Sequence, residues 1–179
     1  RDWSSDVCSS DLSPEPDRRW PRRLRVGYVS ADFRSHVVAS FLLPVFARHD
    51  RARFELFAYY AHPARDEITD VFQGMADAWV DCAALGDAQL AERIRADRID
   101  LLVDLAGHTG NHRLGAFALR PAPLQLTWLG YPNTTGLSAI DARISDARAD
   151  PPGDADRHCV ERLVRLPRSF LRSEEHTSE

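Results

Sequence analysis

Two kinds of apolar segment alternate along the middle of the chain. Short runs such as LRVGYVS (24–30) and IDLLVDLAG (99–107) are typical of strands, the second of a strand buried on both faces. Segments such as RDEITDVFQGMAD (65–77) space apolar residues three and four positions apart, which predicts helices. The predicted strands cover 24–30, 53–61, 78–83, 99–107, 122–131, 141–152 and 161–170, and the predicted helices cover 37–50, 65–77, 86–98 and 111–120.

This alternation predicts the fold class. Strands that alternate with helices form βαβ units, which place the strands parallel with helices on both faces. We therefore expect an α/β fold with a doubly wound, mainly parallel, Rossmann-like sheet. Pro44 lies inside the helix predicted at 37–50, so a kink or a late helix start is expected there.

The two ends of the chain do not share this pattern. Residues 1–12 (RDWSSDVCSSDL) and 172–179 (RSEEHTSE) are polar and aperiodic. They resemble translated adaptor or vector sequence, and natural disordered tails are the alternative. Residues 13–23 are rich in proline and charge and predict a linker. We expect one Rossmann-like domain over 24–171, cut from a longer protein if both ends are non-native.

Composition narrows the class of protein. The 179 residues are 44% hydrophobic and 28% charged, as in soluble globular proteins. No apolar run approaches the roughly 20 residues of a membrane span, and the start lacks a signal-peptide pattern. The net charge of -4 gives no reason to expect nucleic acid as a partner. Outside the tails only Cys82 and Cys159 remain, too few for a disulfide framework, which favours a reduced, cytoplasmic protein.

Polar loops follow three of the predicted strands. They are SADFRSH (30–36), GHTGNHR (107–113) and GYPNTTG (130–136). Ligands of open α/β sheets bind beyond the carboxyl ends of the strands, where these loops lie. The three loops together therefore predict a binding site at that edge of the sheet.

Each loop has a functional and a purely structural interpretation. His36 stands at a helix start, where a neutral imidazole can accept a proton or hydrogen bond from a hydroxyl, or can merely cap the helix. Gly107 and Gly110 would let a ligand approach the backbone beside His108, or would simply form a tight turn. The segment 130–136 could hold a sugar or nucleotide, or could be only a turn.

Several common site motifs are missing. The first predicted strand is not followed by GxGxxG, the dinucleotide-binding fingerprint. A Walker loop would need a lysine, and all 23 basic residues are arginine. No cysteine and histidine spacing indicates zinc, and no GxSxG indicates a hydrolase. Neither a cofactor nor a metal is predicted.

Two blocks carry a family resemblance. GYVSADFRSHVVAS (27–40) and LRPAPLQLTWLGYPNTTG (119–136) resemble the catalytic region of the SPINDLY-type protein O-linked N-acetylglucosamine transferases, and the likeness extends over 24–171. This resemblance implies the N-terminal half of a GT-B fold, in which two Rossmann-like domains face each other. It also implies an inverting glycosyltransferase that moves N-acetylglucosamine from UDP-N-acetylglucosamine to serine or threonine of proteins. One plant branch uses GDP-fucose.

The resemblance also implies roles for individual residues. His36 matches the family's DF-x-x-H histidine, a catalytic residue as base or as orienting group. Implied partners are a nucleotide sugar and protein acceptors. The family's second GT-B domain and tetratricopeptide repeats are absent, so the chain alone should have little or no activity. The alternative is a non-catalytic Rossmann-like module that binds a protein or nucleotide. Predicted substrate-binding residues are Asp32, Gly107, His108, Thr109, Gly130, Tyr131, Pro132 and Thr135.

Overall fold

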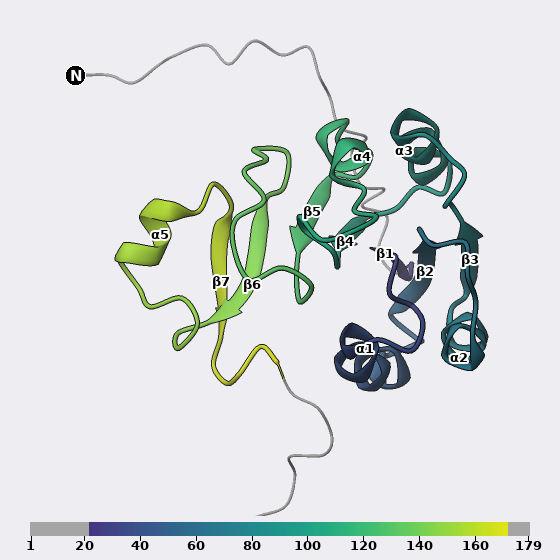
Figure 1. The fold of residues 1–179 in the computed structure, drawn as a ribbon, viewed down its shortest axis with the longest axis horizontal. Helices are drawn as coiled ribbons and strands as arrows, with labels where there is room; N and C mark the ends of the chain where they lie inside the picture. The colour runs from purple at the N-terminus through teal and green to yellow at the C-terminus, as the bar shows by residue number, and fades with distance from the viewer. Residues whose placement is uncertain (1–21, 172–179) are drawn as a thin grey trace, which may run out of the picture.

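The computed structural model describes residues 22–171 and shows one parallel sheet between helices (Figure 1). The strand order is β3-β2-β1-β4-β5-β6-β7, and every neighbouring pair is parallel, which confirms the predicted doubly wound α/β class. The strands are β1 (Leu24–Ser30), β2 (Phe54–Tyr60), β3 (Ala78–Asp81), β4 (Leu101–Asp104), β5 (Leu124–Thr127), β6 (Ala142–Asp146) and β7 (Arg162–Leu166). The helices are α1 (Val37–Arg48), α2 (Glu67–Met75), α3 (Asp87–Ala96), α4 (Leu114–Ala118) and α5 (Asp154–His158).

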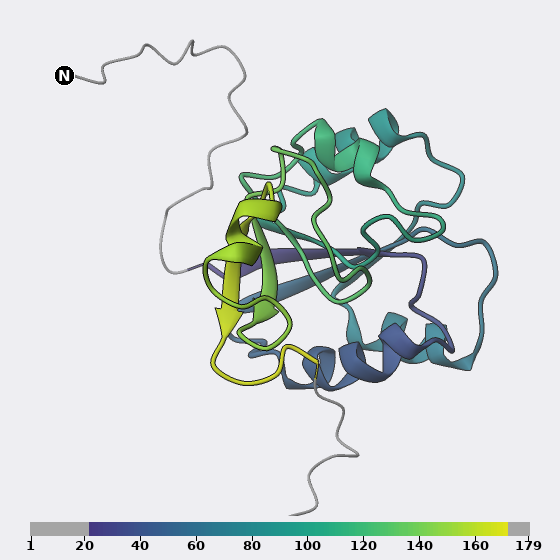
Figure 2. The same ribbon diagram turned by 60° about the vertical axis from the view of Figure 1, so that its left-hand side comes forward.

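Helices cover both faces of the sheet. In the turned view, α1 and α2 lie below the strands while α3 and α4 lie above them (Figure 2). Each face has its own buried hydrophobic cluster. The chain therefore winds one way from β1 to β3 and then crosses back through α3 to β4, which pairs with the other side of β1.

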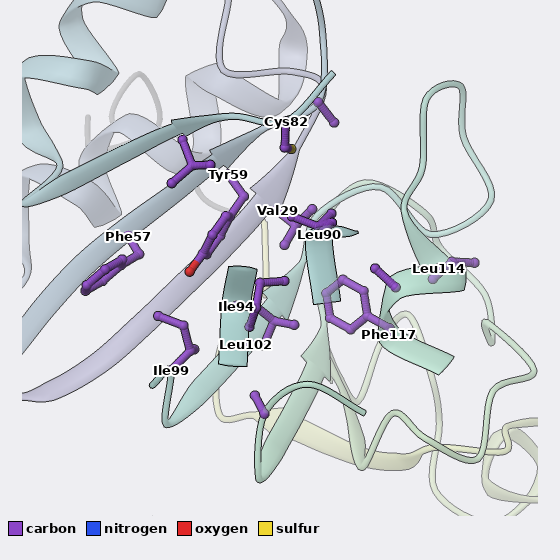
Figure 3. Close-up of a cluster of buried hydrophobic side chains, with 14 of the residues drawn as sticks. Val29, Phe57, Tyr59, Cys82, Leu90, Ile94, Ile99, Leu102, Leu114 and Phe117 are labelled. Atoms are coloured by element: carbon purple, nitrogen blue, oxygen red, sulfur yellow. The ribbon is translucent and has the colours of Figure 1, made fainter. Parts of the chain in front are cut away.

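Side chains of the central strands alternate between the two clusters. Val26 and Tyr28 of β1 belong to the cluster between the sheet and helices α1 and α2. Val29 belongs to the cluster between the sheet and helices α3 and α4 (Figure 3). Gly27 faces the same way as Val29, and a Cβ there would lie 3.0 Å from Leu102. The crowding above Gly27 shows that this glycine allows the β1–β4 centre of the sheet to pack closely.

A group of aromatic side chains lies in the cluster between the sheet and helices α1 and α2. Phe33, which follows β1, is fully buried. Its ring centroid lies 5.9 Å from that of Phe46, 5.2 Å from Phe72 and 5.6 Å from Trp79. Contacts of this kind fix the loop after β1 against both helices of that face.

Some predicted bounds are wrong. The helix α1 begins at Val37, as predicted, and includes Pro44, so the alternative of a late start is wrong; the helix ends at Arg48 rather than at residue 50. The strand predicted at 122–131 ends at Thr127, because Gly130 N–H donates to the Trp128 carbonyl at 3.0 Å across Leu129, whose φ is +79°. That is a γ-turn of the strained, positive-φ form. The strand predicted at 99–107 likewise ends at Asp104.

The short helix α5 was not predicted. It buries none of its five residues, so the sequence there carries no apolar period. The predictions for residues 1–12, 13–21 and 172–179 lie outside the described residues. Cys82 is buried and Cys159 half-buried, and both are free thiols. Over 22–171, none of the helices is both long and apolar enough to cross a membrane.

Candidate active site

The candidate site lies where the winding of the sheet reverses. The strands β1 and β4 are neighbours, yet β1 leads to α1 on one face and β4 leads to α4 on the other. At their carboxyl ends the loops diverge, and doubly wound sheets bind ligands at such a point. The amide of Leu105 still donates to Val29 O at 3.1 Å, so the two segments stay paired for one residue beyond β4 before they diverge.

The loop after β1 is held at three points before α1 begins. Ser30 Oγ accepts from the Asp32 amide at 2.9 Å, and Phe33 is buried in the aromatic group. The Ser35 amide donates to the Asp66 carboxylate at 2.7 Å. That hydrogen bond, together with those from Thr69, holds the pKa of Asp66 below its usual range. The loop is therefore anchored to the start of α2 as well as to the core.

His36 is the N-cap of α1. Its Nδ1 accepts from the Val38 amide at 3.3 Å and lies 3.6 Å from an Asp32 carboxylate oxygen. The imidazole remains 38% exposed, while the Asp32 carboxyl is 14% exposed. The capping interpretation of His36 is thus confirmed, and the ring is also open to a ligand.

Asp104 organises the loop after β4 from below. This fully buried carboxylate accepts from the Thr127 hydroxyl at 2.7 Å, the Gly107 amide at 2.8 Å and the Ala106 amide at 3.1 Å. Burial raises the pKa of Asp104, and the three hydrogen bonds oppose that rise. Nearby, Thr109 Oγ1 donates to Ala106 O at 2.8 Å and closes the turn.

The loops after β4 and β5 interlock. Gly107 has a φ of +55°, and a Cβ on it would lie 2.3 Å from Tyr131 Cβ. A Cβ on Gly130 would lie 1.9 Å from Leu105 O. Both glycines therefore permit loop to pack on loop, whereas Gly110 has open space around it.

Aromatic rings gather above the interlocked loops. The His108 ring meets Tyr131 edge-on with centroids 5.3 Å apart, and meets His112 in the same way at 6.0 Å. His108 Nε2 lies 2.9 Å from Thr135 O. His108, His112 and Pro132 are exposed and Tyr131 is half-buried, so this group of rings presents a face to solvent.

Two buried charged residues hold the segment 130–136 from the side of β6 and β7. Glu161 is 3% exposed and accepts from Thr134 Oγ1 at 2.6 Å and from Thr135 N at 2.7 Å and Thr135 Oγ1. Arg143, also 3% exposed, donates to Pro132 O at 3.3 Å while paired with Asp150. Burial favours a higher pKa for Glu161, but the threonine hydrogen bonds outweigh it and hold that pKa below its usual range.

The predicted residues therefore fall into two groups. Hydrogen bonds, ring contacts and close packing join Gly107, Tyr131, His108 and Thr135. Gly130 packs on Leu105, Thr109 bonds to Ala106 and Pro132 to Arg143, all in the same pair of loops or beside it. His36 is linked instead to Asp32 and Val38. Within residues 22–171, none of the hydrogen bonds or ring contacts joins the two groups. Sequence reasoning missed Asp104, which sits inside an apolar strand, and missed Glu161 and Arg143, whose distance along the chain hides their contact with this segment.

A separate hollow of about 790 Å³ lies beyond the ends of β6 and β7. None of the predicted site residues lines it. The described residues also include no group of three histidine, cysteine or acidic side chains placed to hold a metal ion. The lining residues of the hollow are Asp146, Ala147, Arg148, Ala149, Leu166, Pro167, Arg168 and Ser169.

Comparison with known proteins decides the family. Residues 13–177 match glycosyl transferase family 41. The chain belongs to glycosyl transferase family 41. A solved structure of a mutant Thermobaculum terrenum O-GlcNAc transferase is 47% identical in sequence to this chain. It superposes with a TM-score of 0.82, and the match covers 93% of this chain and 31% of the Thermobaculum terrenum chain.

Curated relatives agree with this assignment to family 41. A protein from Petunia hybrida named probable UDP-N-acetylglucosamine--peptide N-acetylglucosaminyltransferase SPINDLY is 43% identical over 96% of this chain. A Caenorhabditis elegans protein named UDP-N-acetylglucosamine--peptide N-acetylglucosaminyltransferase is 36% identical over 84% of this chain. The chain spans 19% of the petunia protein and 13% of the nematode protein. It therefore represents a small part of the relatives' length.

Proposed function

We propose that this chain is the first of two Rossmann-like halves of a GT-B protein O-glycosyltransferase, which transfers N-acetylglucosamine from UDP-N-acetylglucosamine to serine or threonine. The observation that carries the proposal is the similarity to the Thermobaculum terrenum O-GlcNAc transferase, at 47% identity and a TM-score of 0.82. A cytoplasmic setting, with a nucleotide sugar and acceptor proteins as partners, belongs to the same proposal.

The reaction is an inverting displacement. The acceptor hydroxyl oxygen forms a bond to the anomeric carbon, the bond from that carbon to the diphosphate breaks, and UDP leaves with the electron pair. The hydroxyl proton must then pass to a base or to water. In this proposal, the reacting groups lie between the loops after β1 and β4.

The contacts of His36 favour an orienting role. Its Nδ1 accepts from the Val38 amide, so the neutral ring carries its proton on Nε2. A ring with its proton on Nε2 can donate a hydrogen bond to the hydroxyl oxygen of the acceptor serine or threonine. The same nitrogen cannot also remove the proton of that hydroxyl. To act as the base, the ring would have to exchange Val38 for Asp32 at Nδ1, a carboxylate 3.6 Å away.

In this proposal, the groups that stabilise the departing diphosphate lie mainly in the second domain. Glycosyl transfer requires positive groups or hydrogen-bond donors aimed at the leaving charge, which commonly supply a large share of the rate enhancement. The chain has no lysine, and it spans only 31% of the solved relative. We therefore expect the 179-residue chain to have little or no activity alone, and to need the second domain of the longer protein.

The test is a donor comparison with the longer protein that contains this chain. The protein is incubated with an acceptor protein and either UDP-N-acetylglucosamine or GDP-fucose, and sugar on serine and threonine is detected by mass spectrometry. The 179-residue chain serves as the control and should be inactive. Transfer from UDP-N-acetylglucosamine supports the proposal, transfer from GDP-fucose alone refutes the donor, and transfer from neither refutes the enzyme.

A further inference from the structure

Glu161 is a buried carboxylate that the proposed reaction does not use directly. It lies just before β7 and is 3% exposed. Its carboxylate accepts hydrogen bonds from the neighbouring residues Thr134 and Thr135. Thr135 is held twice, through its amide at 2.7 Å and through its hydroxyl. The Gly136 amide, which lies in the same peptide plane as the Thr135 carbonyl, donates to Thr134 Oγ1 at 3.1 Å and so fixes the direction of that carbonyl.

That carbonyl determines the tautomer of His108. Thr135 O lies 2.9 Å from His108 Nε2. A carbonyl oxygen can only accept, so Nε2 must carry the proton and donate it. The neutral ring then has its lone pair on Nδ1. No hydrogen bond to this Nδ1 comes from any residue in 22–171, and the ring lies exposed beside Tyr131.

We propose that Glu161 is a positioning residue: through Thr135 it holds His108 as the Nε2–H tautomer, and His108 Nδ1 accepts a hydrogen bond from a hydroxyl or amide N–H of the sugar nucleotide. The ligand in this statement rests on the proposed function. The tautomer and its dependence on Glu161 do not, since both are properties of the free protein.

The arrangement repeats a principle of metal sites, where the partner of one ring nitrogen sets the chemistry of the other. Here the partner is a backbone carbonyl, and a charged side chain buried behind it fixes its place. Charge-assisted hydrogen bonds are stronger than neutral ones, so a carboxylate holds the two threonines more firmly than an amide would. Replacing Glu161 by glutamine should therefore loosen His108 without removing any group from the site.

The first test is NMR of the ¹⁵N-histidine-labelled 179-residue chain at about pH 8, where an ordinary imidazole is neutral. His108 signals are assigned by their loss in His108→Gln. We expect wild-type His108 to show the Nε2–H tautomer, and Glu161→Gln to show a mixture of tautomers. The matched control is Glu55→Gln, because Glu55 of β2 pairs with Arg25 of β1, away from this segment, and its replacement should leave His108 unchanged.

Two results would overturn the proposal. One is a wild-type His108 that carries its proton on Nδ1 or populates both tautomers equally. The other is a folded Glu161→Gln protein whose His108 tautomer is unchanged. If Glu161→Gln does not fold, Glu161→Asp takes its place, since the shorter carboxylate cannot reach both threonines equally well and should also produce a mixture.

A second test uses a double-mutant cycle in the longer protein. His108→Gln keeps an amide donor near the position of Nε2 but removes the Nδ1 acceptor. We expect His108→Gln to raise the KM for UDP-N-acetylglucosamine about tenfold with little change in kcat. Glu161→Gln should raise it less, about twofold for an equal mixture of tautomers, because part of the protein keeps the competent ring. The double variant should match His108→Gln alone. Multiplying effects would mean that Glu161 does not act through His108. Absence of transfer by the wild type would refute the proposed function, and the NMR result would still decide the role of Glu161.

Discussion

The carboxylate of Asp104 accepts a hydrogen bond from the hydroxyl of Thr127 at 2.7 Å, directly beneath the candidate site. Both residues are at the last position of their strands, β4 and β5, and they are register partners. The same carboxylate accepts from the Gly107 and Ala106 amides. One buried group therefore ties two strands to the loop that carries His108.

Thr127→Val tests this connection. Valine has nearly the shape of threonine but leaves Asp104 without its hydroxyl donor, in a buried place where water does not replace it. We expect a loss of about 1–3 kcal/mol in the free energy of unfolding, measured by urea titration. Thr127→Ser keeps the hydroxyl and should lose less. Equal losses in the two variants would show that the hydroxyl does not matter.

Gly130→Ala tests the interlock of the two loops. The added Cβ would lie 1.9 Å from Leu105 O, a backbone atom that cannot move without disturbing β4. We expect a loss of about 1–3 kcal/mol or more in the free energy of unfolding. Gly110→Ala is the matched control, because nothing lies within 4 Å of its Cβ position. A Gly130→Ala protein as stable as Gly110→Ala would contradict the observed packing.

Phe33→Ala separates core from site in the loop after β1. The ring is fully buried among Phe46, Phe72 and Trp79, so its removal should cost about 3–5 kcal/mol. Val37→Ala, four residues later and 63% exposed in the wild type, should change stability by less than about 0.5 kcal/mol. Thermal and urea unfolding measure both. A small effect of Phe33→Ala would place the ring outside the core.

Glu161 should make the free energy of unfolding sensitive to acid. Its folded pKa lies below the ordinary value of 4.5, so unfolding takes up a proton when the pH lies between the two values. The stability contributed by this carboxylate is therefore present above pH 4.5 and is lost as the pH falls through the folded pKa. Glu161→Gln should be less stable at neutral pH and should show a flatter acid limb in a plot of unfolding free energy against pH. An unchanged slope would contradict this.

The sheet could be predicted because buried parallel strands consist of continuous runs of apolar residues, such as the run that contains Leu102 and Val103. The short helix α5 could not, because it buries no side chain and so leaves no period. The ends of β4 and β5 were placed too late because apolar residues continue past them. Leu105 and Leu129 pack against the core from loop positions, and periodicity does not distinguish such residues from strand residues.

The candidate site was only partly predictable. Parallel strands bring the loops that follow them to one edge, so the positions of His36, His108 and Tyr131 followed from the strand pattern alone. The residues that hold them did not. Asp104 lies within an apolar run that is typical of a strand, so nothing in the sequence marks it as a site residue. Glu161 lies 26 residues along the chain from Thr135. Such partners are set by tertiary packing, which a single sequence does not display.

His36 offers a way to separate capping from chemistry. Asparagine is among the best N-cap residues, so His36→Asn should keep the start of α1 and leave the free energy of unfolding nearly unchanged. His36→Ala removes the cap as well and should cost about 0.5–2 kcal/mol. A His36→Asn protein that unfolds as easily as His36→Ala would show that the histidine stabilises the loop by something other than capping.

The central proposal is that this chain is the half of a glycosyltransferase that contributes His36 to the active site. It is tested most directly by measuring transfer of radiolabelled N-acetylglucosamine from UDP-N-acetylglucosamine to an acceptor protein, with the longer wild-type protein and its His36→Asn variant. The account predicts transfer by the wild type and a rate lower by about 100-fold in the variant at equal Tm, because the shorter asparagine cannot reach the acceptor hydroxyl to orient it. Full activity in His36→Asn would contradict it.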